Sequence, residues 1–275
     1  MTVFEKAYAK INLFLDVTGR RQDGYHEVNT LMRSISLCDD IHLEARPSDK
    51  TTITIICNDS FLDTGESNLI YKAALKYLLK FKIFADIKLH LVKRIPIGAG
   101  LGGGSSDAAA TLRAMNKIFA LATKEQLLEI AAELGSDVPF CIDGGSAFCS
   151  GRGEIIRPEK ITMPSYVVVS IGKDRVSTPT AYAMLDERYG DFARYNEEKN
   201  IPDGEWIYYN IFEFVIKLDE IRDARRILME NGASHALMSG SGPAVFGCFD
   251  SFFDASSAKA ALKKNGLLAF KCRII

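Results

Sequence analysis

Residues 96–107 read PIGAGLGGGSSD, which places five glycines in twelve positions, followed by two serines and an aspartate. Fixing a glycine costs backbone entropy, so such a run belongs where side chains would be in the way. The preceding stretch 85–96 alternates as a strand does, and helical periodicity follows from about 105 to 119. The unpaired amides and positive dipole at the start of that helix predict an anion site in the loop.

Three readings of this loop differ in the ligand that they imply. A Walker A loop requires GxxxxGK[ST], and no lysine occupies the required position. Gly98, Gly100 and Gly103 match the dinucleotide pattern GxGxxG, but the acidic residue expected about twenty positions later is missing. We therefore expect a nucleoside triphosphate, with a dinucleotide or a plain connecting turn as alternatives. Ser105 or Ser106 is expected to cap the following helix.

Composition and charge exclude several classes of protein. Of the 275 residues, 47% are hydrophobic and 25% charged, which is typical of a globular protein. The net charge of −1 argues against non-specific binding of nucleic acid. No apolar run resembles a signal peptide or a membrane span. The six cysteines form no CxxC pair, so we expect reduced thiols, no zinc site and a cytoplasmic protein without nucleic-acid or membrane partners.

Strand-like and helix-like segments alternate along the rest of the chain. In the first part we expect a strand at 3–17, a strand pair at 41–47 and 51–58, a helix from Asn68, a helix at 124–134 ending at Gly135, and a strand or hairpin at 146–158. In the second part we expect a strand at 166–172, helices at 178–189, 221–232 and 256–266, a loop at 190–206 and a final strand at 267–275. The mixture predicts an α+β architecture in two domains, divided near 155–165.

A second glycine cluster, Ser239–Pro243, lies between two apolar strands. Such a cluster is often only a hairpin turn. It also has the composition to close over a ligand beside the first glycine loop.

Four segments together resemble the GHMP kinase family. They are AYAKINLFLDVTGRRQDGYHEV (7–28), PIGAGLGGGSS (96–106), GSDVPFCIDGGSAFCSGRGE (135–154) and ALMSGSGPAVFG (236–247). The resemblance covers essentially the whole chain. It implies an N-terminal ATP-binding domain at 1–160, a C-terminal domain at 161–275 and an active site in the cleft between them.

The resemblance also implies catalytic roles for Lys10 and Asp137. Asp137 follows a helix end and precedes Val-Pro, so it belongs on a turn. Lys10 lies in an apolar strand, where a buried ammonium group needs a partner. By resemblance, Asp137 is the base for the acceptor hydroxyl, and Lys10 lies beside it and keeps it ionised. From the residues alone, Asp137 could be a turn residue and Lys10 an outward-facing lysine.

The implied cofactors are ATP and Mg²⁺. By resemblance, the residues that bind the nucleotide are Asn68, Pro96, Ile97, Gly98, Ala99, Gly100, Leu101, Gly102, Gly103, Gly104, Ser105 and Ser106. Asn68 is also placed to cap its helix. Ser106 is the candidate magnesium ligand, although Mg²⁺ is often held largely by phosphate and water.

The first and third motifs are most similar to a branch of the family that phosphorylates the 2-hydroxyl of cytidine diphosphate-linked methylerythritol, in non-mevalonate isoprenoid biosynthesis. The residues expected around this small-molecule substrate are Asn12, Tyr25, His26, Thr180 and Tyr182. His26 would read the cytosine edge, and Tyr25 would stack on the base. Alternatives are a kinase for homoserine or mevalonate, or a non-catalytic nucleotide sensor, and the protein is expected to be a monomer or homodimer. Relatives often have NDLE where this chain has NIFE at 210–213, so no binding role is assigned there.

Overall fold

The computed structural model describes residues 1–190, 192, 195 and 208–275. The chain divides into two compact units that interleave along the sequence. The first unit comprises Met1–Ala9, Leu37–Ile97 and Gly102–Gly144, and the second comprises Lys10–Ser36, Gly98–Leu101 and Gly145–Ile275. Two long strands, β1 (Thr2–Arg20) and β2 (His26–Pro47), contribute residues to both units. A domain boundary at residue 160 stays a prediction.

In the first unit, β4 (Ala85–Val92) lies between β2 and β3 (Thr52–Cys57) in the sheet. It runs antiparallel to β2 and parallel to β3. The expected strand pair formed by 41–47 and 51–58 is therefore wrong, because β4 lies between these two segments. A parallel pair needs a crossover connection, and α1 (Leu69–Lys80) provides it between β3 and β4.

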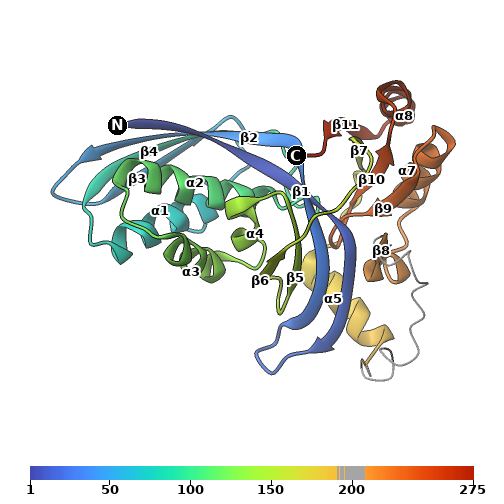
Figure 1. Ribbon diagram of the computed structural model, residues 1–275, viewed down its shortest axis with the longest axis horizontal. Coiled ribbons are helices and arrows are strands. Elements are labelled where there is room, and N and C mark those ends of the chain that lie inside the picture. The colour runs from blue at the N-terminus through green and yellow to red at the C-terminus, as the bar shows by residue number, and fades with distance from the viewer. Residues whose placement is uncertain (191, 193–194, 196–207) are drawn as a thin grey trace. The chain divides into compact units, whose positions relative to one another are not determined.

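Four helices gather on one face of these strands (Figure 1). They are α1, α2 (Gly103–Phe119), α3 (Lys124–Leu134) and the short α4 (Val138–Asp143). The side chain of Asn68 accepts a hydrogen bond of 2.8 Å from the Ile70 amide, which confirms it as the cap of α1. Thr123 and Gln126 form a capping box at the start of α3. The predicted helix at 124–134 and its end at Gly135 are both confirmed.

Helix α2 begins two residues before its expected start. Gly102 occupies the cap position with a left-handed backbone (φ +69°), and no side chain caps the helix. Ser105 and Ser106 consequently lie inside the first turns, and the expected serine cap is wrong. The hydroxyl of Ser106 instead donates a hydrogen bond of 2.7 Å to the carbonyl oxygen of Tyr8. A left-handed start of this kind suits glycine, and no side-chain pattern announces it.

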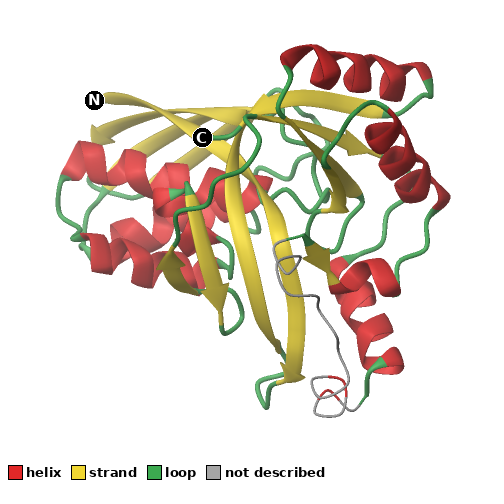
Figure 2. Cartoon of the chain, turned by 45° about the vertical axis from the view of Figure 1, so that its right-hand side comes forward, coloured by secondary structure: helices red, strands yellow, loops and turns green. Residues whose placement is uncertain are grey.

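The second unit contains a four-stranded antiparallel sheet in the order β11-β7-β10-β9. Its strands are β7 (Tyr166–Ile171), β9 (His235–Met238), β10 (Ala244–Phe249) and β11 (Leu268–Arg273). Two helices, α7 (Asp219–Glu230) and α8 (Phe252–Lys264), run along one face of this sheet (Figure 2). Helix α7 turns Ile221, Ala224 and Leu228 into the core, as its amphipathic spacing predicts.

The remaining elements of the second unit extend the two long strands. β1 pairs in parallel with β8 (Tyr209–Asn210), which leads into a 3₁₀ helix (Ile211–Phe214). β2 pairs with β5 (Ser146–Ser150), which pairs with β6 (Ile155–Pro158), so the predicted hairpin is confirmed. The helix expected at 178–189 is α5 (Thr178–Arg188).

The last helix and the segment at 190–206 differ in how far they can be compared with the sequence predictions. The last helix begins at Phe252, four residues before the predicted start, because Ser251 caps it by accepting hydrogen bonds from the amides of Phe253 and Asp254. The loop expected at 190–206 lies almost entirely outside the described residues. Within the described part of the chain, no helix combines the length and apolar character needed to cross a membrane.

Candidate active site

Main-chain hydrogen bonds hold the glycine loop in the second unit. The amide of Lys10 donates a hydrogen bond of 2.9 Å to the carbonyl oxygen of Leu101, and the amide of Ala244 donates one of 3.1 Å to that of Ala99. Strand β1 and the start of β10 thus fix the loop from two directions.

The second glycine cluster packs directly against the first. The hydroxyl of Ser239 donates a hydrogen bond of 3.1 Å to the carbonyl oxygen of Gly100 and accepts one of 3.3 Å from the amide of Asn12. Gly100 has φ +80°, and a Cβ atom there would lie 2.3 Å from the carbonyl oxygen of Ser239. The cluster is therefore both a hairpin turn between β9 and β10 and a support for the first loop, and only glycine fits at position 100.

Asn210 braces this second turn, which sequence reasoning missed. Its buried amide donates hydrogen bonds of 2.8 Å to the carbonyl oxygens of Met238 and Gly240. Nearby, Glu213 accepts one of 2.8 Å from the Met238 amide. Burial raises the pKa of Glu213, while the guanidinium of Arg225 opposes this rise. The NIFE segment thus supports the turn between β9 and β10. The sequence signal for this role was a pair of polar residues, Asn210 and Glu213, in an apolar run.

Lys10 and Asn12 share one face of β1, as the alternation of the strand predicted. The ammonium nitrogen of Lys10 donates a hydrogen bond of 2.7 Å to the side-chain oxygen of Asn12, and both residues are buried. The side-chain nitrogen of Asn12 donates a hydrogen bond of 2.8 Å to the hydroxyl of Thr30. This hydroxyl donates in turn to the carbonyl oxygen of Phe14. This chain of contacts fixes the orientation of the Asn12 amide and directs its oxygen at Lys10.

Asp137 occupies the residue before α4 in the first unit, and its side chain is half-buried. It makes no capping hydrogen bond to that helix, in which Pro139 occupies one of the first two positions. The predicted turn position is confirmed. Because Lys10 belongs to the second unit, its expected pairing with Asp137 stays a prediction.

Two of the residues expected around the substrate, His26 and Tyr182, are in contact in the second unit. The Nε2 atom of His26 lies 2.7 Å from a carboxylate oxygen of Asp186, and the imidazole stacks on Tyr182 with 4.6 Å between ring centroids. Tyr25 is exposed, with the guanidinium of Arg152 over its ring at 4.9 Å. Thr180 lies two residues before Tyr182 in α5, where its amide and hydroxyl contact the capping residue Ser177. Asp186 was missed, because its contact with His26 joins segments 160 residues apart.

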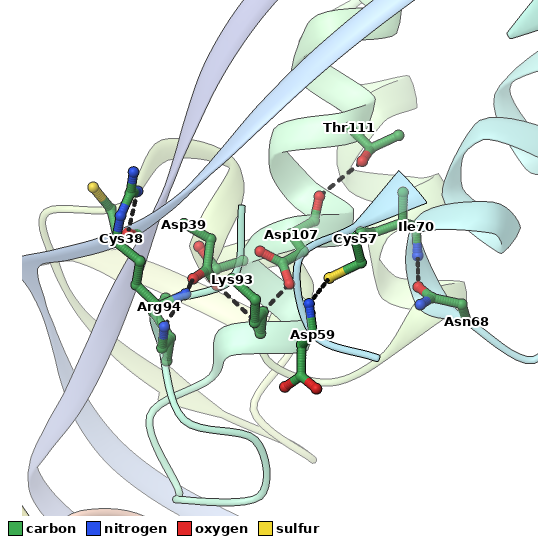
Figure 3. Close-up of polar contacts among 12 residues, drawn as sticks. Cys38, Asp39, Cys57, Asp59, Asn68, Ile70, Lys93, Arg94, Asp107 and Thr111 are labelled. Carbon is green, nitrogen blue, oxygen red and sulfur yellow. Dashed lines mark hydrogen bonds and ion pairs between the residues drawn. The ribbon is translucent and has the colours of Figure 1, made fainter. Parts of the chain in front are cut away.

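A third group of polar residues surrounds Lys93, close to the start of α2 (Figure 3). The ammonium nitrogen of Lys93 donates hydrogen bonds of 2.5 Å to Asp39 and 2.6 Å to Asp107. Burial raises the pKa of Asp107 well above its usual value, and the Asp39 carboxylate adds to the rise against the opposing effect of Lys93. This triad was also missed, because its residues come from a strand, the segment after another strand, and a helix.

The candidate magnesium ligand predicted from the sequence is Ser106. Among the described residues, no group of three or more His, Cys, Asp or Glu side chains gathers as metal ligands. The hydroxyl of Ser106 is buried and already donates to Tyr8. Mg²⁺ commonly binds through phosphates and keeps several waters, and one or two protein oxygens suffice to hold it.

Two family models match this chain and define its class. Residues 68–145 match the GHMP kinases N terminal domain, and residues 204–267 match GHMP kinases C terminal. Two solved structures share the fold at low identity. The homoserine kinase of Cytophaga hutchinsonii has a TM-score of 0.69 and 19% identity, covering 99% of this chain and 97% of that one. The mevalonate kinase of L. major has a TM-score of 0.73 and 17% identity, covering 100% and 97%. The chain belongs to the GHMP kinase family.

Closer relatives identify the branch of that family. A solved 4-(cytidine 5'-diphospho)-2C-methyl-D-erythritol kinase has a TM-score of 0.80 and 32% identity over 99% of both chains. Proteins named 4-diphosphocytidyl-2-C-methyl-D-erythritol kinase include that of Acetivibrio thermocellus, 38% identical over 94% of both chains. The protein of that name from Prochlorococcus marinus is 40% identical over 94% of this chain and 87% of its own. Within the GHMP kinases, this chain groups with the 4-diphosphocytidyl-2-C-methyl-D-erythritol kinases.

Proposed function

We propose that this protein transfers the γ-phosphoryl group of ATP to the 2-hydroxyl of 4-diphosphocytidyl-2-C-methyl-D-erythritol, giving the 2-phosphate and ADP. The substrate is the one that the full-length relatives are named for. The reaction is a step of non-mevalonate isoprenoid biosynthesis.

One observation carries the proposal from the side of the structure. Lys10 contributes a buried ammonium group, while its own backbone amide is hydrogen-bonded to Leu101 in the glycine loop. A phosphate chain bound by that loop and by the start of α2 would therefore lie near a fixed positive charge. Phosphoryl transfer depends mainly on positioning and on charge neutralisation, and this arrangement supplies both.

Asp137 completes the proposed chemistry. Its carboxylate accepts the proton of the acceptor hydroxyl as the hydroxyl oxygen bonds to the γ-phosphorus, and the bond from that phosphorus to the bridging oxygen of ADP breaks. Lys10 stabilises the transferring charge. The mechanism requires Asp137 and Lys10 to meet at the acceptor hydroxyl when both substrates are bound.

The contacts of His26 support recognition of the cytidine part. The Nε2 atom of His26 lies 2.7 Å from a carboxylate oxygen of Asp186, and this contact fixes the orientation of the imidazole ring. The ring of Tyr182 stacks on the imidazole, and Tyr25, the residue before His26 in the chain, is exposed. Stacking of a base on an aromatic ring is worth about 1–3 kcal/mol. Asn12 would bind near the reacting hydroxyl and Asn68 near the nucleotide. We further propose that Mg²⁺ enters with ATP and that the enzyme acts in the cytoplasm, as a monomer or homodimer.

The deciding experiment measures ADP release with magnesium-ATP and, in parallel, the cytidylated methylerythritol, homoserine and mevalonate. Turnover confined to the cytidylated substrate is expected. Turnover with another alcohol would keep the kinase and exclude the proposed substrate. ATP binding without turnover on any of the three would favour a nucleotide sensor instead.

A further inference from the structure

A buried ionic triad lies beneath the first turns of α2 (Figure 3). The side chains of Asp39, Lys93 and Asp107 are at most 5% exposed. Asp39 lies on β2, Lys93 directly follows β4, and Asp107 lies on α2. A single ammonium group therefore links two strands to the helix that leaves the glycine loop.

The contacts of the triad are concentrated on both sides of the glycine loop. The second carboxylate oxygen of Asp39 accepts hydrogen bonds of 2.5 Å from the Arg94 amide and 2.8 Å from the Ile95 amide. On the other side, a Cβ atom at Gly103 would lie 3.0 Å from the ammonium nitrogen of Lys93. The triad thus holds the segment that enters the loop and contacts the first residue of the helix that leaves it.

Stability alone does not account for this arrangement. Apolar residues can often replace a buried ion pair without loss of stability, because removing two charges from water is costly. Here two carboxylates share one ammonium, and the Oδ1 atom of Asp107 has no hydrogen-bond partner among the described residues. What the triad supplies, and apolar packing does not, is directional contact at fixed distances.

We infer that Lys93, held between Asp39 and Asp107, is a positioning residue for nucleotide binding, because it sets the first turns of α2 relative to the segment entering the glycine loop. This inference rests on the proposed function, in which the amides of that first turn receive the phosphates of ATP. Lys93 acts through these main-chain groups, and no contact with the nucleotide is assigned to it.

The test compares four variants in the full-length protein. Lys93→Met removes the ammonium group, and Asp107→Ala removes its link to α2. Asp107→Asn keeps an oxygen that can accept from Lys93. Tyr77→Phe is the matched control, because it removes one partly buried hydrogen bond, of 2.8 Å to Asn116, near the opposite end of the same helix. Each variant is measured for magnesium-ATP affinity by calorimetry, for the KM of the alcohol substrate, for melting temperature, and for hydrogen exchange at the Ser106 amide.

Lys93→Met and Asp107→Ala are expected to weaken magnesium-ATP binding by about tenfold to a hundredfold, since small misplacements of binding groups have effects of this size. Exchange at Ser106 should speed up, while the KM of the alcohol changes little. Asp107→Asn should stay close to the wild-type affinity, and Tyr77→Phe should lower only the melting temperature.

The inference would be overturned if Lys93→Met and Asp107→Ala bound magnesium-ATP with wild-type affinity and only their melting temperatures fell, as in Tyr77→Phe. The triad would then have a structural role alone. If Lys93→Met does not fold, equal affinities of Asp107→Ala and Asp107→Asn would overturn it equally. If the wild-type protein itself does not bind magnesium-ATP, the proposed function fails, and the inference fails with it.

Discussion

Lys10 directs its ammonium group at the side-chain oxygen of Asn12, 2.7 Å away and two residues along the same buried face of β1. The backbone of Lys10 is simultaneously bonded to the glycine loop through Leu101. The position of a buried charge is therefore set by a neighbouring amide and by the loop that it is proposed to serve.

Asn12→Ala tests the importance of this orientation. Loss of the amide oxygen should let the ammonium of Lys10 shift, and turnover should fall by about tenfold to a hundredfold. Thr18→Val is the control, because Thr18 lies farther along the same strand and its hydroxyl donates a hydrogen bond of 3.4 Å to the carbonyl oxygen of Glu27. ADP release at saturating substrates measures the effect. Unchanged turnover in a folded Asn12→Ala protein would remove Asn12 from the mechanism.

Gly100→Ala should be far more damaging than the same change at another left-handed glycine. At Gly100 the new Cβ atom would clash with the carbonyl oxygen of Ser239, whereas at Gly266, with φ +79°, it would meet nothing within 4 Å. Gly266→Ala should therefore cost only the backbone term, about 1–2 kcal/mol of unfolding free energy. Gly100→Ala should also abolish ATP binding. Urea unfolding and calorimetry distinguish the two, and equal effects would contradict the close packing of the two turns.

Asp137→Asn should separate binding from chemistry. The amide keeps the shape of the side chain but cannot accept the proton of the acceptor hydroxyl. Turnover should fall by about two to four orders of magnitude, which is the usual contribution of a general base. Calorimetric affinity for magnesium-ATP should stay near that of the wild type. Near-normal turnover would show that Asp137 is not the base.

His26→Ala should act mainly on the affinity for the cytidylated substrate. We expect its apparent KM to rise by about tenfold or more, because a site that hydrogen-bonds its ligand loses both the contact and the stacking surface. The KM for ATP should remain unchanged. His90→Ala, an exposed histidine on β4, serves as the control. An equal rise in the KM values of both substrates would argue against a base-reading role.

Glu213 should make folding stability depend on pH in a defined direction. Its pKa is raised in the folded protein, mainly by burial, so the folded state holds this proton more tightly than the unfolded state. The free energy of unfolding should therefore fall as pH rises from the ordinary carboxyl range through the raised pKa, and level off above it.

Glu213→Gln should remove this part of the slope, and Glu66→Gln, at an exposed position, should retain it. Urea midpoints measured at a series of pH values provide the comparison. An identical slope in wild-type and Glu213→Gln protein would contradict the assignment.

Local patterns in the sequence predicted much of the fold. Periodicity located α1, α3 and α5, and Asn68 and Gly135 marked helix ends, because those signals act within one turn of helix. The order of β3 and β4 was not predictable in this way, since strand pairing depends on distant segments. The start of α2 was missed because a left-handed glycine leaves no side-chain pattern.

The same distinction applies to the site. The two glycine clusters, and Lys10 with Asn12 on one strand face, could be read from spacing alone. Asn210, Asp186 and the triad at Lys93 could not, because each acts on partners that only the tertiary fold brings near. The proximity of Lys10 and Asp137 stays a prediction from the family.

The bond between Ser239 and Gly100 has a consequence for protein synthesis. Residues 98–101 of the glycine loop are synthesised more than a hundred residues before the residues that fix it or its supporting turn. These later residues are Asn210, Ser239 and Ala244. At about 5–20 residues per second, synthesis of these partners follows that of the loop by roughly ten seconds. A growing or truncated chain therefore contains the glycine loop before it contains the residues that fix the conformation of that loop.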